Sequence, residues 1–209
     1  MINGILRAQG ASINTPLPPS WLGRTDAPAT TPPWSSIQQL NSTQIRNLVA
    51  QIGYDMSTWD YQLVGTSNQL GRYQFNSQIL ENYGILALGS NAKYGNSCVN
   101  YKICWKSVPR RNAYAQYNFN FSNIYGFLAS STAQDVLAYQ LIIDTYNALL
   151  DNGAIIATDT ADVAAGMIYV GWVLGPGTNN TAGAYLWRNS GVGNGVNAYN
   201  SGRYAALIL

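Results

Sequence analysis

The segment from Ser130 to Gly153 constrains the fold most, because it has the length and apolar spacing of a long helix. Its apolar side chains are Val136, Leu137, Leu141, Ile142, Tyr146, Leu149 and Leu150. The pattern predicts a helix that opens at Ser130 or Ser131, with Asp135 near its start, and ends at Asn152–Gly153.

Four further segments make the predicted fold class mainly α (α+β). A segment from about Thr160 to Val173 is apolar on nearly every side, which predicts a buried helix. Shorter helices are expected from Ser42 to Gly53, from about Phe75 to Tyr83 and near Ala184 to Arg188, with loops in the rest of 178–202. The alternation at Tyr117–Phe121 predicts a short strand or hairpin edge.

The first 41 residues form a region of different composition. They carry Pro16, Pro18, Pro19, Pro28, Pro32 and Pro33 among small polar residues, without periodicity. Proline removes backbone donors and favours extended conformations, so we expect an arm without a core of its own. Such an arm needs support from neighbouring subunits, with Trp21 and Trp34 as anchors. The predicted domains are the arm, 1–41, and a domain, 42–209, with an insert at about 88–128.

Composition excludes several classes of chemistry. The chain has no histidine, so it cannot use a Ser-His-Asp or Cys-His mechanism, and it lacks the commonest metal ligand. Its two cysteines cannot make a four-ligand zinc site without distant carboxylates. We therefore expect no metal and no cofactor. The chemistry that remains is that of carboxylates, as in glycosidases, or none.

Two short motifs are similar to those of a known protein family. The run Leu70-Gly71-Arg72-Tyr73-Gln74-Phe75 follows Asp55, and Gly175-Pro176-Gly177 follows an apolar helix. In this order the motifs resemble those of lysozyme-like or lytic-transglycosylase-like domains, over about residues 42 to 205. That family has Glu-Ser-Gly where this chain has Asp55, and histidine where it has Trp172.

The resemblance implies a site. It places Asp55 at the general-acid position, and Tyr73, Gln74 and Trp59 along a glycan-binding cleft. Aspartate is one methylene shorter than glutamate, and a misplacement of about 1 Å can cost about a hundredfold in rate. Glu81 is the only glutamate, and we interpret it as a solvated residue on the outer face of its helix.

The insert at about 88–128 is basic and aromatic. No acidic residue lies between Glu81 and Asp135, while five basic residues do, including Arg110 and Arg111. We interpret the insert as a surface that docks partner proteins, with these two arginines as contacts. Stacking on a glycan or on single-stranded nucleic acid is an alternative, and an ordinary solvated loop is another.

Surface composition and cysteine usage bear on location. Only 10% of residues are charged, against roughly 25% in typical soluble proteins, which favours a surface made for subunit contact over that of a tolerant monomer. No apolar run is long enough for a membrane span, and Met1–Gly10 does not resemble a secretory signal. Cys98 and Cys104 can pair, but an origin in reducing cytosol favours free thiols.

The leading hypothesis is a structural phage virion protein of the tail or baseplate, built on a catalytically degenerate lysozyme-like domain. It would be made in the host cytoplasm and bind other virion proteins, in several copies of a symmetric assembly. Peptidoglycan is a further candidate partner, and nucleic acid is not expected. The alternative is an active virion-associated peptidoglycan hydrolase, a lysozyme or lytic transglycosylase, that uses Asp55. A third class is a small carbohydrate-binding module without an assembly role.

Overall fold

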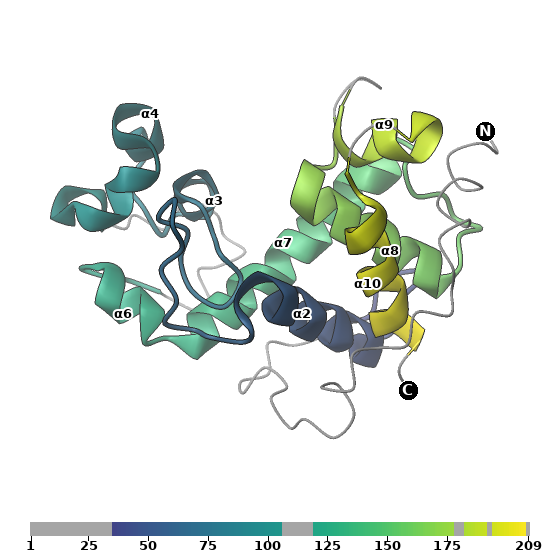
Figure 1. The fold of residues 1–209 in the computed structure, drawn as a ribbon, viewed down its shortest axis with the longest axis horizontal. Coiled ribbons are helices and arrows are strands. Elements are labelled where there is room, and N and C mark those ends of the chain that lie inside the picture. The colour runs from purple at the N-terminus through teal and green to yellow at the C-terminus, as the bar shows by residue number, and fades with distance from the viewer. Residues whose placement is uncertain (1–34, 106–118, 178–181, 192–193, 208–209) are drawn as a thin grey trace. The chain divides into compact units, whose positions relative to one another are not determined.

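The computed structural model describes residues 35–105, 119–177, 182–191 and 194–207 (Figure 1). This part of the chain is mainly α, as predicted, and has no sheet. Its strand pairing consists of two isolated antiparallel bridges, Val64 with Leu70 and Leu70 with Phe75. The predicted strand at 117–121 is not found at residues 119–121, and its first two residues lie outside the described part.

The chain divides into two compact units. Unit 1 comprises residues 1–52 and 139–209, and unit 2 comprises residues 53–138. The division falls inside two helices, α2 (Ser42–Ser57) and α7 (Ser131–Asp151). Unit 1 also holds α8 (Ala161–Leu174), α9 (Gly183–Ser190) and α10 (Val196–Leu207). Unit 2 holds α3 (Ser77–Asn82), α4 (Ser90–Tyr94), the 3-10 helices η2 (Gly95–Asn100) and η3 (Lys102–Trp105), and α6 (Ile124–Leu128).

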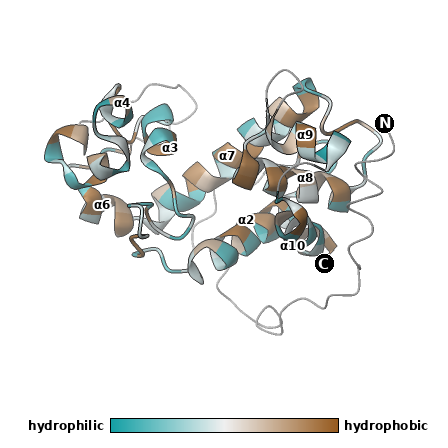
Figure 2. Ribbon diagram, turned by 45° about the horizontal axis from the view of Figure 1, so that its top comes forward, coloured by the Kyte–Doolittle hydropathy of each residue, from teal (hydrophilic) through white to brown (hydrophobic). Residues whose placement is uncertain are grey.

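Helix α2 begins with a reciprocal cap. The backbone N–H of Gln44 donates to Oδ1 of Asn41 at 2.9 Å, and that of Asn41 donates to Oε1 of Gln44 at 3.0 Å. The apolar positions of α2 are brown among teal polar positions in Figure 2, and Ile45 and Leu48 are fully buried. The helix does not end at Gly53 as expected but continues to Ser57.

Three predicted helices are confirmed, α7, α8 and α9. Oγ of Ser130 accepts the backbone N–H of Ala133 at 3.2 Å, which caps α7 at the predicted start. Helix α8 is buried along most of its length, as its continuous apolar character predicts. Helix α9 lies at the predicted position, one or two residues longer at each end.

Residues 196–202 were predicted as loop, but they form the first part of helix α10, so that prediction is wrong. Its sequence has two Asn, one Gly and three Ala among twelve residues, which leaves little apolar periodicity. The helix packs on α8, where a Cβ on Gly202 would lie 2.5 Å from the carbonyl oxygen of Ala165. The two backbones can approach this closely only because residue 202 is glycine. This packing on α8 stabilises α10 as a helix.

Unit 2 has an aromatic core. Phe127 of α6 lies 6.3 Å from Phe75, 6.1 Å from Trp105 and 5.6 Å from Phe121 between ring centroids. Phe127 and Phe75 are fully buried and Trp105 is 3% exposed. These contacts join the segment after α2, the 3-10 helices and α6 into one core, so the predicted insert contributes to it.

Candidate functional site

The predicted acid, Asp55, lies in the last turn of α2 and is exposed. The chain then turns sharply, because Thr58 and Trp59 both adopt positive φ, 56° and 67°. Trp59 is 8% exposed, and its ring packs 4.5 Å from that of Tyr54. The predicted glycan-binding indole is thus mostly covered by its own unit.

Thr58 has φ in the left-handed region that glycine favours. Oγ of Ser57 lies 2.7 Å from the carbonyl oxygen of Arg72 and 3.1 Å from that of Gly53.

The second half of the motif is a buried turn. Gly71 has φ of +72°, and a Cβ there would lie 2.0 Å from Oε1 of Gln134, so only glycine fits. That same oxygen accepts the backbone N–H of Arg72 at 2.9 Å. The amide nitrogen of Gln74, a half-buried residue, donates to the carbonyl of Gly71 at 2.8 Å. The motif residues mostly bind one another or the start of α7.

Asp135 is the centre of a buried polar cluster, which we call the Asp135 cluster: Tyr61, Arg72, Tyr73 and Asp135. The hydroxyl of Tyr73 donates to Oδ1 of Asp135 at 2.6 Å. The hydroxyl of Tyr61 donates to the same carboxylate at 2.7 Å. Nη1 of Arg72 in turn donates to the Tyr61 oxygen at 2.8 Å. Asp135 is fully buried, and Arg72 and Tyr73 are 2% and 1% exposed.

Burial dominates the electrostatics of this cluster. Loss of hydration raises the pKa of Asp135 to about 6, although hydrogen bonds from Tyr73 and Tyr61 and the charge of Arg72 act in the opposite direction. Burial, together with the negative charge of Asp135, also raises the pKa of both tyrosines above the ordinary value. The tyrosines therefore remain protonated donors at neutral pH.

The Asp135 cluster combines features of an acid site and of a structural site. A carboxyl with a pKa near 6 suits general acid chemistry. However, its side chain has no exposed surface and its oxygens accept two hydroxyls of the same unit. The predicted cleft residue Tyr73 is one of those donors. The cluster holds α7 to the 61–73 segment.

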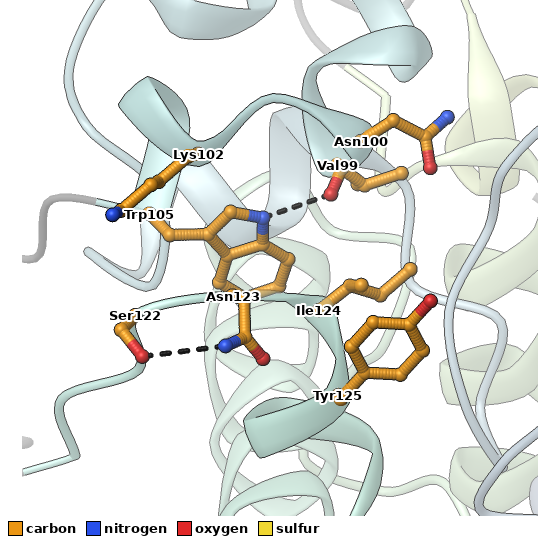
Figure 3. A pocket seen from close by; sticks show the side chains of 8 residues that line it. All are labelled: Val99, Asn100, Lys102, Trp105, Ser122, Asn123, Ile124 and Tyr125. Atoms are coloured by element: carbon orange, nitrogen blue, oxygen red, sulfur yellow. Dashed lines mark hydrogen bonds between the residues drawn. The ribbon is translucent and has the colours of Figure 1, made fainter.

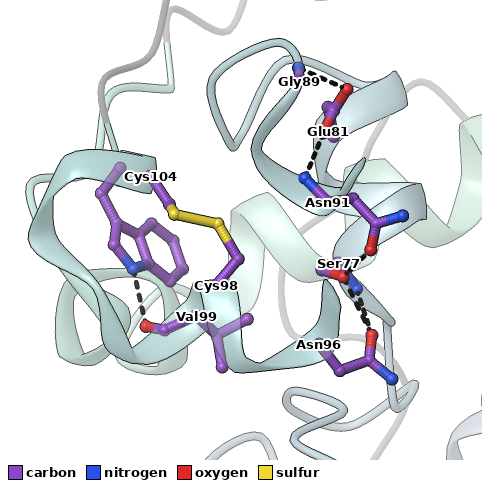
Figure 4. Close-up of a disulfide and its surroundings, with 9 residues drawn as sticks. Ser77, Glu81, Gly89, Asn91, Asn96, Cys98, Val99 and Cys104 are labelled. Atoms are coloured by element: carbon purple, nitrogen blue, oxygen red, sulfur yellow. Dashed lines mark hydrogen bonds between the residues drawn. A yellow bond between two sulfur atoms is a disulfide. The ribbon is translucent and has the colours of Figure 1, made fainter. Parts of the chain in front are cut away.

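Glu81 is buried, so its interpretation as a solvated residue is wrong. Its side-chain oxygens accept the backbone N–H of Gly89 at 2.8 Å and of Asn91 at 2.7 Å (Figure 4). Residue exposure is 7%. The carboxylate binds the start of α4, where exposed amide groups favour a negative charge.

Cys98 and Cys104 form a disulfide, with 5.9 Å between their Cα atoms, so the expectation of free thiols is wrong (Figure 4). Both residues are fully buried. Just beyond the bridge, Nε1 of Trp105 donates to the carbonyl of Val99 at 2.8 Å. Together the bridge and this bond close the loop from 98 to 105.

A pocket of about 430 Å³ lies between this loop and the start of α6 (Figure 3). Its lining residues are Val99, Asn100, Lys102, Trp105, Ser122, Asn123, Ile124 and Tyr125. Sequence reasoning placed the insert on the surface but did not find the pocket, because its two walls are about 20 residues apart. None of Asp55, Trp59, Tyr73 and Gln74 lines it.

Other predicted site residues belong to different places. The partner contacts Trp21, Trp34, Arg110 and Arg111 lie outside the described residues. Trp172 is half-buried on α8. In unit 1 the Gly-Pro-Gly loop is held by Asn152, whose amide donates to the carbonyls of Pro176 at 2.9 Å and Gly177 at 3.1 Å.

Comparison with known proteins gives no identification. No protein-family model, curated protein or solved structure matches this chain. Within the described ranges, no group of three or more metal-ligating Cys, Asp or Glu side chains is found. Likewise, no helix in those ranges is long and apolar enough to cross a membrane. The lysozyme-like resemblance therefore stays a prediction from the motifs.

Proposed function

We propose that this chain is a structural component of a phage virion, in the tail or baseplate, whose lysozyme-like domain has lost its catalytic acid. The observation that carries the proposal is the placement of the carboxylates. Asp55 at the predicted acid position is exposed, whereas the buried carboxylates Asp135 and Glu81 bind structural partners in their own unit.

The acid position itself supports a loss of activity. A general acid that works near neutrality needs an apolar environment to raise its pKa. Trp59 and Tyr73 were the candidates to supply it, but the ring of Trp59 packs on Tyr54 and the hydroxyl of Tyr73 binds Asp135.

The surface of unit 2 supports a role in contact with other proteins. Leu88 is 71% exposed, Ile103 53% and Tyr125 77%. Large apolar side chains of this exposure are common where subunits associate. With only 10% charged residues in the chain, such a surface fits an assembly component better than a protein that diffuses alone.

The proposal is tested in purified phage particles. Quantitative mass spectrometry of gradient-purified particles should find this chain at a fixed multiple of the major tail proteins. Chain that is absent from the particles, or present only in trace amounts that further purification removes, would contradict a structural role.

Activity is tested on the purified chain by zymography on bacterial cell walls. We expect no clearing by the wild-type chain and none by Asp55→Asn. Clearing by the wild type that disappears in Asp55→Asn would instead identify an active virion-associated peptidoglycan hydrolase.

A further inference from the structure

One wall of the pocket is formed by the segment that the Cys98–Cys104 disulfide closes. Val99, Asn100 and Lys102 lie within this segment, and Nε1 of Trp105 donates a hydrogen bond to the carbonyl of Val99. Because both cysteines and Trp105 are buried, this wall is fixed by the core of unit 2. A pocket of about 430 Å³ is within the usual range of roughly 300–1,000 Å³ for small-molecule sites.

The opposite wall is fixed by a helix cap. Oδ1 of Asn123 accepts the backbone N–H of Gly126 at 3.0 Å and so caps α6. Its Nδ2 lies 3.4 Å from Oγ of Ser122, a long contact that leaves amide hydrogen-bonding capacity for a ligand. Tyr125, in the first turn of α6, is 77% exposed.

The lining combines apolar and polar side chains (Figure 3). Val99 and Trp105 are buried, whereas Asn100, Lys102 and Asn123 are exposed. Amide and hydroxyl groups both donate and accept hydrogen bonds, which suits a ligand that carries several hydroxyls. The exposed ring of Tyr125 offers a flat apolar face of the size of one sugar ring.

Charge favours an acidic ligand. Among the described residues, Lys102 is the only charged side chain of the lining, and no acidic residue lies between Glu81 and Asp135 in the sequence. Glu81 itself is buried and binds backbone N–H groups. The described lining thus offers a carboxylate one cation and no acidic side chain to repel it.

We propose that this pocket binds an acidic saccharide, with a sugar ring stacked on Tyr125 and a carboxylate paired with Lys102. The described lining offers one cation and one exposed aromatic ring. A single nucleic-acid strand would need a row of both, since affinity for strands comes from repeated phosphate contacts and stacked bases. The proposal depends on the geometry of unit 2 alone and not on the virion role.

The test is a titration of the full-length chain with a trimer of galacturonic acid, followed by NMR chemical shifts and calorimetry. Its fully methyl-esterified form is the matched neutral probe. We expect saturable binding of the acid with shifts at Asn100, Asn123 and Tyr125, and binding at least about tenfold weaker for the ester. A difference of tenfold corresponds to about 1.4 kcal/mol, a reasonable value for one charged contact.

Three variants locate the site, each with its fold checked by the NMR spectrum. Lys102→Met should weaken binding of the acid about tenfold, and Tyr125→Ala should weaken both probes by a similar factor. Lys93→Met is the control, because Lys93 carries the same charge outside the lining, with its Nζ 5.0 Å from the ring centroid of Tyr94. It should change binding less than about twofold.

Three results would overturn the proposal. They are the absence of saturable binding by the wild type, equal binding of the acid and the ester, and equal weakening by Lys102→Met and Lys93→Met. The last result would mean attraction by overall positive charge and not by a pocket.

Discussion

The two units bury aspartates in different ways. In unit 1, Asp159 pairs directly with Arg188 at 2.5 and 2.8 Å, and both side chains are 6% exposed. In unit 2, Asp135 accepts hydrogen bonds from the hydroxyls of two tyrosines, and Nη1 of Arg72 donates to one of these, Tyr61. Direct pairing supplies a full opposite charge, whereas tyrosines supply only hydrogen bonds.

A second aspartate of unit 1, the half-buried Asp162, differs from Asp135 in the direction of its pKa shift. In unit 1, burial acts to raise the pKa of Asp162, but hydrogen bonds from Thr160 and Arg203 and the charge of Arg203 outweigh it, so the pKa is lowered. In unit 2 the pKa of Asp135 rises to about 6 because burial prevails. The same residue type therefore stabilises the two units in opposite pH ranges.

The largest expected effect comes from breaking the direct pair of unit 1. Arg188→Met leaves Asp159 buried without its cation and also removes the bond from Nη1 to the carbonyl of Ala154. Loss of one partner of a buried ion pair costs about 3–5 kcal/mol. Urea unfolding at pH 7 should show that loss. Arg46→Met, at an exposed position of α2, is the control and should change stability by less than about 0.5 kcal/mol.

A pH series tests the tyrosine-bound acid of unit 2. The pKa of Asp135 in the folded protein, about 6, lies above the ordinary value of 3.8. The contribution of Asp135 to the free energy of unfolding is therefore full below about pH 4 and is lost as the pH rises through 6. The unfolding free energy of the wild type, relative to Asp135→Asn, should fall by about 3 kcal/mol between pH 4 and 7.5. A relative rise over that range would contradict the burial argument.

Tyr73→Phe should have a smaller effect that depends on pH. It removes the donor at 2.6 Å from Asp135 without changing the ring. A hydrogen bond to a buried charged group is worth about 2 kcal/mol. The loss should therefore be larger at pH 8, where Asp135 is charged, than at pH 5. Equal losses at both values would mean that the carboxyl does not titrate between them. Tyr125→Phe, at an exposed position, is the matched control.

The smallest effect is expected at the more exposed pair of unit 1. Arg203→Met removes contacts of 2.7 and 2.8 Å to Asp162, whose side chain is 16% exposed. A partly solvated pair contributes about 1 kcal/mol. Because the pKa of Asp162 is lowered, this loss should be present at pH 7 and fade as the pH falls below about 4. A loss that grows in acid would contradict the assignment.

Regular apolar spacing made part of the fold predictable. The helices α7 and α8 were placed almost to the residue, because their buried positions repeat along the sequence. Helix α10 was missed, since it packs through small residues such as Gly202 and leaves little apolar periodicity.

Sites assembled from distant segments were not predictable in the same way. The partners of Glu81 are backbone groups of a later loop, which no side-chain pattern encodes. The Asp135 cluster joins residues 61, 72, 73 and 135. One signal was available, because Asp135 precedes Val136 and Leu137 in an apolar segment, where a carboxylate needs buried partners.

We propose that the carboxylates of this chain serve structure and not catalysis. The decisive measurement is the release of reducing ends and of anhydro-sugar ends from purified peptidoglycan between pH 4 and 8. Wild type and Asp55→Asn should both stay at the level of an enzyme-free blank at every pH. Release by the wild type that Asp55→Asn abolishes would show that Asp55 is catalytic.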